Sequence, residues 1–102
     1  MAGRVEAYIH SDSITPNKGG ALVTVSCETD FAAKTPVFAE FCKLVAKMAY
    51  GLQKANPVEL LEEMPDLEVK LFELSGKLKE RISVGPITIQ SLPSKSVFEM
   101  TH

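Results

Sequence analysis

The chain has 102 residues, 45% of them hydrophobic and 24% charged, and its net charge is −2. This length suits one domain with one modest core, and the composition is typical of a globular protein. The weak negative charge gives no basic stripe to neutralise phosphates, which argues against nucleic acid as a partner. No apolar run approaches the roughly 20 residues that cross a bilayer, and no signal-peptide pattern opens the chain, so we expect no membrane and a cytoplasmic location.

Two strands begin the predicted fold. In residues 3–10 apolar and other side chains alternate, as in a strand with one wet face. The apolar set is Val5, Ala7 and Ile9, and the other set is Glu6, Tyr8 and His10. Residues 21–27 are apolar and β-branched, which predicts a second strand, antiparallel to the first. The polar residues 11–20 predict an irregular hairpin loop.

Helices are predicted next. Thr35 as cap and Pro36 at the first position start a helix that runs to about Gln53. Its apolar residues recur every three or four positions and are Phe38, Phe41, Val45, Met48 and Leu52. Asn56 and Pro57 start a short second helix, which Pro65 interrupts. A third helix from Asp66 carries a stripe that we assign to the core rather than to a coiled coil: Leu67, Leu71, Leu74 and Leu78.

The closing strand is predicted over residues 82–90, where Gly85 and Pro86 break the pattern. Proline cannot donate to a ladder, so this strand lies at an edge, is bulged, or pairs on one side only. We predict an α+β fold, in which two or three helices pack on one face of a small antiparallel three-stranded sheet. Residues 1–92 form the single domain, and residues 93–102 are a weakly ordered tail or a short added strand.

The cysteines and histidines give little support for chemistry. Cys27 and Cys42 fit best as buried, reduced thiols, with a disulfide as the alternative. His10 and His102 stand at opposite ends, so the spacing of a metal site is missing and we expect no metal or cofactor. An enzyme with Cys27 as nucleophile and His10 as base has weak support, because the sequence offers no group that would activate the thiol.

The segment from Cys27 to Lys34 is the candidate site, because it places acids, a hydroxyl and an aromatic between a strand and a helix. Phe31 lies too far upstream of Thr35 to be a hydrophobic staple, so a protruding side chain and a core aromatic both stay open. For Glu28 we favour a solvated loop charge. Asp30 is either solvated or bonded locally to backbone N–H groups.

This segment closely resembles the signature of elongation factor Ts, the guanine-nucleotide exchange factor of the GTPase elongation factor Tu. Residues 4–10, 21–34 and 38–48 are similar to that family, and residues 79–84 are similar less closely. The chain departs from the usual family pattern in a longer hairpin turn, in Ala32 where valine is usual, and at Gly85 and Pro86. The printed sequence starts directly at the first predicted strand, where the family usually has an N-terminal helical domain, and it has length for only one of the two usual core subdomains. We therefore expect either a naturally reduced relative or an excised subdomain.

The resemblance implies a function without covalent chemistry. An exchange factor for elongation factor Tu would bind through Thr29, Asp30, Phe31 and Ala32. Phe31 would insert as a wedge near the magnesium and phosphate site, while Asp30 would anchor the loop. The alternative is a non-exchanging module that competes for, or adapts, elongation factor Tu.

A lone subdomain also leaves a sheet edge and a sheet face without a partner. We therefore predict a symmetric homodimer or a sheet-to-sheet association, because an isologous pair is the commonest way to cover one such patch. The residues expected near its contact come from the closing strand and are Ile82, Val84, Ile87 and Ile89.

Overall fold

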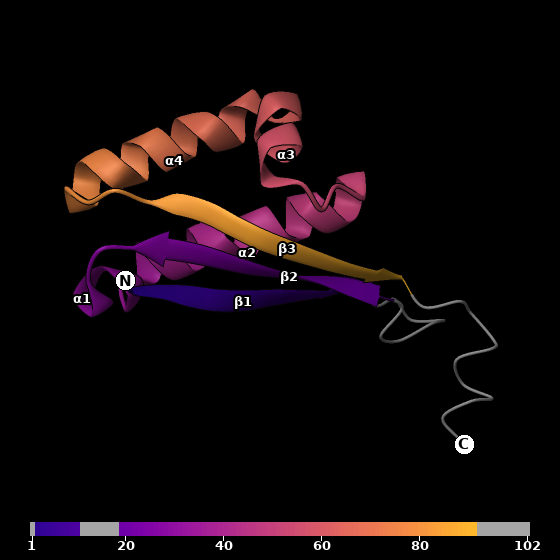
Figure 1. Ribbon diagram of the computed structural model, residues 1–102, viewed down its shortest axis with the longest axis horizontal. Coiled ribbons are helices and arrows are strands. Elements are labelled where there is room, and N and C mark those ends of the chain that lie inside the picture. The colour runs from indigo at the N-terminus through magenta and orange to yellow at the C-terminus, as the bar shows by residue number, and fades with distance from the viewer. Residues whose placement is uncertain (1, 11–18, 92–102) are drawn as a thin grey trace, which may run out of the picture.

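The computed structural model describes residues 2–10 and 19–91, which form an α+β fold as predicted (Figure 1). Its elements in chain order are β1 (Ala2–His10), β2 (Gly19–Cys27), α1 (Asp30–Ala33), α2 (Pro36–Leu52), α3 (Pro57–Glu63), α4 (Pro65–Leu78) and β3 (Ser83–Ser91). Most of the predicted hairpin loop, residues 11–18, and the predicted tail lie outside the described residues. Gly19 and Gly20, which we assigned to that loop, are instead the first residues of β2.

The three strands form one antiparallel sheet in the order β1-β2-β3. The prediction that the first two strands pair is confirmed, with Tyr8 opposite Ala21. β3 is an edge strand and also contains an irregularity, because Val23 pairs with Ile87 whereas Val25 pairs with Val84. One residue of β2 therefore faces the Gly85-Pro86 pair, which is the bulge that this dipeptide predicted.

The helix starts follow the predicted caps. The Thr35 hydroxyl accepts a hydrogen bond from the Phe38 N–H, and Pro36 occupies the first turn of α2. The Asn56 side chain accepts from the N–H groups of Val58 and Glu59 at 2.9 and 3.3 Å. These bonds satisfy N–H groups that a helix leaves unpaired at its start.

The core lies between the sheet and α2, which packs across β1 and β2. Cys27 and Cys42 are free and buried in this core, as predicted. The largest fully buried side chains are Phe38, Leu60, Leu67, Val23, Val25, Val45, Cys27 and Cys42. α4 packs mainly against α2 and α3, whereas α2 crosses the sheet (Figure 1). No helix in the described residues is both long and apolar enough to cross a membrane.

In β1 the apolar side chains face solvent and the other set faces the helices, which is the opposite of what alternating hydrophobicity usually indicates. Val5 and Ile9 are 57% and 60% exposed, whereas Glu6 and Tyr8 face the helices and are half-buried. Glu6 is paired there with Arg4, whose Nε lies 2.5 Å from the carboxylate. The Tyr8 ring packs beside that of Tyr50, with centroids 5.8 Å apart. These polar residues lie on the inner face because each has a partner there.

The β3 residues that we expect near a dimer contact do not form an exposed apolar face, and the dimer itself stays a prediction. Ile82 and Ile87 are 7% and 8% exposed and belong to the core, and Val84 and Ile89 pack against that core. Their side chains therefore face the helices, and the uncovered face of the sheet is formed by other residues.

Candidate functional site

The loop between β2 and α2 contains a one-turn helix, α1, where the sequence predicted only a loop. Thr29 is its N-cap, and the Thr29 hydroxyl accepts a hydrogen bond from the Ala32 N–H at 3.2 Å. A second helix follows almost at once, because the Thr35 hydroxyl donates to the Ala32 carbonyl at 2.8 Å and also caps α2. The loop is thus a compact corner between two capped helices.

The corner presents two side chains to solvent. Phe31 is 83% exposed, so the alternative of a core aromatic is wrong. Asp30 is exposed as well, and within the described residues its carboxylate accepts no hydrogen bond, so it does not bond to the turn. Ala32 is only 1% exposed and packs into the core beneath the loop, so any contribution of Ala32 to binding would be indirect.

Two distant segments hold this corner. Glu80, which follows α4, accepts hydrogen bonds from the N–H groups of Glu28 and Thr29 at 2.9 and 3.0 Å, and from the Thr29 hydroxyl. Arg4 of β1 donates from a guanidinium N–H to the Ala33 carbonyl at 3.1 Å, which fixes the other end of α1.

Sequence reasoning missed these supports. Glu28, interpreted as a solvated charge, is exposed but accepts from the Arg81 N–H at 2.5 Å. Only the weaker resemblance of residues 79–84 to the family could have drawn attention to Glu80.

The electrostatics of the corner follow from these contacts. Hydrogen bonds to its ionised form, first from the Thr29 hydroxyl, lower the pKa of Glu80 below its ordinary value. Burial raises the pKa of the Cys27 thiol, with the Glu80 charge as a smaller cause. Burial likewise raises the pKa of Cys42 to about 12. Both thiols are therefore neutral at physiological pH and poor nucleophiles.

The alternative of a Cys27–His10 catalytic pair is contradicted by the strand register. Cys27 lies opposite Ala2, whereas His10 lies opposite Gly19 at the other end of the same ladder. At about 3.4 Å per residue, the two positions are on the order of 27 Å apart. In the described part of the chain, no three His, Cys, Asp or Glu side chains are grouped as a metal site would require.

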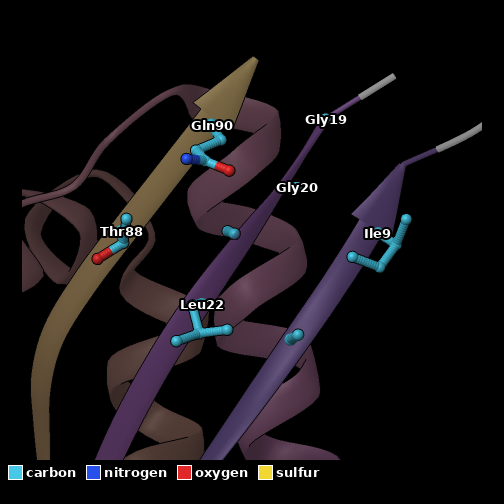
Figure 2. Close-up of a pocket in the computed structure, with 8 residues that line it drawn as sticks. Ile9, Gly19, Gly20, Leu22, Thr88 and Gln90 are labelled. Carbon is cyan, nitrogen blue, oxygen red and sulfur yellow. The ribbon is translucent and has the colours of Figure 1, made fainter. Parts of the chain in front are cut away.

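A second exposed surface is the face of the sheet that the helices leave open, which we call the open face. Its aliphatic side chains are Val5, Ile9 and Leu22, with exposures of 57%, 60% and 48%. A hollow on it is lined by residues of all three strands, among them Ile9, Leu22 and Thr88. Figure 2 shows these side chains projecting from the strands on the side away from the helices.

Comparison with known proteins identifies elongation factors as relatives of this chain. The elongation factor Ts of Rubrobacter xylanophilus is 52% identical over an alignment that covers 96% of this chain. That of Neisseria meningitidis is 48% identical over 82% of the chain, and the chloroplastic elongation factor Ts of Rhodomonas salina is 34% identical over 83%. No family model matches the chain.

The chain belongs to the elongation factor Ts family. It spans only part of each of these relatives: 59% of the Rubrobacter protein, 28% of the Neisseria protein and 42% of the Rhodomonas protein. The matched part is therefore a segment that the longer proteins extend.

Proposed function

We propose that this chain is a guanine-nucleotide exchange factor for elongation factor Tu, or the partner-binding core of one. Membership of the elongation factor Ts family supports this. Residues 1–92 would be one core subdomain, followed by a tail over residues 93–102. The protein would act where translation takes place, which we take to be the cytoplasm, although the Rhodomonas relative is named chloroplastic.

The observation that carries the proposal is the exposure of Phe31 on a corner that the rest of the fold holds in place. Because the Phe31 ring is 83% exposed, the free chain does not gain most of the free energy that burying the ring would give. Burying it in a partner would recover about 1.5–3 kcal/mol, or roughly tenfold to over a hundredfold in an equilibrium constant. Phe31 is thus suited to be a binding hot spot.

Exchange needs no covalent step. A protein that binds the nucleotide-free GTPase better than the GDP-bound form shifts the equilibrium toward release, by no more than that difference in free energy. In our proposal Phe31 inserts as a wedge near the magnesium and phosphate site. Asp30, whose carboxylate is free of partners within the described residues, anchors the loop beside it. Thr29 contributes by capping α1.

Release of labelled GDP from elongation factor Tu tests the proposal. The GTPase is loaded with fluorescent GDP, excess unlabelled GDP is added, and the release rate is followed as the chain is titrated. We expect the rate to rise with chain concentration and to saturate. An unchanged rate in the presence of demonstrable binding would favour the alternative, a module that competes for or adapts the GTPase.

We further propose that the chain forms a symmetric homodimer through the open face rather than through β3. This face carries Val5, Ile9 and Leu22, and in the described residues no helix covers it. Two copies related by a twofold axis would cover the same patch on each other, which is the commonest solution for a single exposed face.

A further inference from the structure

Glu80 joins two segments that are far apart in the sequence. It follows Lys79, the left-handed C-cap of α4 with φ of 57°, so it leads the chain from the helix toward β3. Its carboxylate reaches the link between β2 and α1, where it accepts from Glu28 and Thr29. The partners stand 52 and 51 positions away, so the contact depends on the fold and not on local sequence.

The contact is reciprocal. While Glu80 accepts from the link after β2, the Glu28 carboxylate accepts from the backbone N–H of Arg81. Four hydrogen bonds thus tie residues 28–29 to residues 80–81, each with a carboxylate oxygen as acceptor. Charge-assisted bonds of this kind are roughly twice as strong as neutral ones.

The Thr29 hydroxyl carries the effect of this contact into α1. It donates to Glu80 and accepts from the Ala32 N–H, so both of its hydrogen-bonding functions are engaged. A helix of four residues does not hold its shape alone, because helix nucleation is unfavourable. The direction in which Asp30 and Phe31 project therefore depends on Thr29, and through Thr29 on Glu80.

We propose that Glu80 is a positioning residue for nucleotide exchange. Without touching the GTPase, it holds the corner of Thr29, Asp30 and Phe31 in the arrangement that binds it. The inference rests on the proposed function. In most free molecules Glu80 keeps the corner in the arrangement that binds the GTPase. Loss of Glu80 lowers the fraction of molecules in that arrangement and raises the apparent dissociation constant in proportion.

Three variants test this inference. Glu80→Ala removes all three acceptor contacts, whereas Glu80→Gln keeps one carbonyl oxygen and loses the charge. Glu68→Gln is the matched control, because Glu68 is exposed on α4 and its substitution changes the net charge by the same amount as Glu80→Gln. Each variant is compared with the wild type in GDP release, melting temperature and the NMR signals of the Glu28 and Thr29 amides.

We expect Glu80→Ala to raise the concentration for half-maximal GDP release about tenfold, with the maximal rate largely kept, since only the competent fraction changes. Glu80→Gln should fall between Glu80→Ala and wild type, and Glu68→Gln should match wild type. The Glu28 and Thr29 amide signals should move in both Glu80 variants. A purely structural role would lower the melting temperature while leaving the half-maximal concentration of the folded chain unchanged.

The outcomes separate the two proposals. If the wild-type chain does not speed GDP release, the proposed function fails. If the wild type is active and both Glu80 variants keep its half-maximal concentration, only the positioning role fails. Should Glu80→Ala not fold, Glu80→Gln decides: an unchanged half-maximal concentration overturns the inference.

Discussion

The corner after β2 and the open face of the sheet both expose apolar side chains, but they are held in different ways. Phe31 stands on a one-turn helix whose position depends on Arg4 and Glu80, two side chains from elsewhere in the fold. Ile9 and Leu22 stand on strands within a continuous ladder, and their positions need no support of that kind.

This difference suggests two modes of binding. A single ring on a narrow corner fits insertion into a cleft, where one residue supplies most of the binding energy. Several smaller aliphatic side chains spread over a sheet fit a flat contact, where area and shape complementarity matter more. These two modes agree with our proposals that the corner binds the GTPase and that the open face binds a second copy of the chain.

The strongest test of the comparison is Phe31→Ala. We expect the half-maximal concentration for GDP release to rise tenfold or more by the hot-spot estimate, because the variant removes the proposed wedge. Since Phe31 is 83% exposed, the free energy of unfolding should change by less than about 1 kcal/mol. Thermal unfolding and GDP release are measured on the same samples.

The chain offers a matched control in Phe72→Ala, since Phe72 on α4 is also a largely exposed phenylalanine, at 74%. It should leave GDP release unchanged. Equal losses in the two variants would mean that exposed aromatic area in general, and not the corner, drives binding.

On the open face, Leu22→Glu should abolish the dimer at micromolar concentration. A twofold contact buries the new carboxylate twice, and a buried unpaired charge is costly. Val69→Glu is the control, because Val69 is 55% exposed on α4, away from the open face. Sedimentation equilibrium gives the mass. A wild-type chain that stays at 11.1 kDa when concentrated would rule out the dimer itself.

What could be predicted from the sequence was local. Thr35-Pro36 and Asn56-Pro57 place their helices because a cap and a first-position proline act within one turn. Pro86 limited the closing strand to an edge, a bulge or one-sided pairing because it lacks one N–H, and β3 is an edge strand with a bulge. The four residues of α1 are too few to show a helical period, so the same rules could not find that helix.

What could not be predicted depends on contacts across the fold. Val5 and Ile9 seemed the natural inner face of β1, but Glu6 and Tyr8 occupy it because Arg4 and Tyr50 supply partners there. The supports of the candidate site are hidden for the same reason, since they join residues 29 to 53 positions apart. Only the exposed segment itself, and not what holds it, can be recognised in the sequence.

A smaller effect is expected at Asp30, which we propose acts through an oriented acceptor as well as its charge. Asp30→Ala removes both and should weaken GDP release by about three- to tenfold, the loss of one charge-assisted hydrogen bond. Asp30→Asn keeps one acceptor oxygen and should weaken it less. Asp66→Asn, at the exposed start of α4, controls for the lost charge. If neither Asp30 variant differs from wild type, the anchoring role is wrong.

The smallest effect is a pH dependence of the corner. The folded-state pKa of Glu80 lies below the ordinary value of 4.5, because the Thr29 hydroxyl and then the backbone N–H groups of Thr29 and Glu28 bond its ionised form. A lowered pKa in the folded state means that the stabilising contribution is fully present above pH 4.5 and is lost as the pH falls through the lower value.

The charged groups around this carboxylate are Glu28 across the link and Lys79 and Arg81 beside it, and Asp30 follows Thr29 in the chain. The response of Glu80 therefore has to be separated from that of the other two carboxylates. To separate them, the NMR signal of the Thr29 amide is followed against pH in the free wild-type chain and in Glu80→Gln. In wild type the signal should move with a midpoint below 4.5, because its N–H bonds directly to the titrating group. In Glu80→Gln that transition should vanish, whereas a transition that survives the substitution would show that Glu80 is not the group that moves the Thr29 signal.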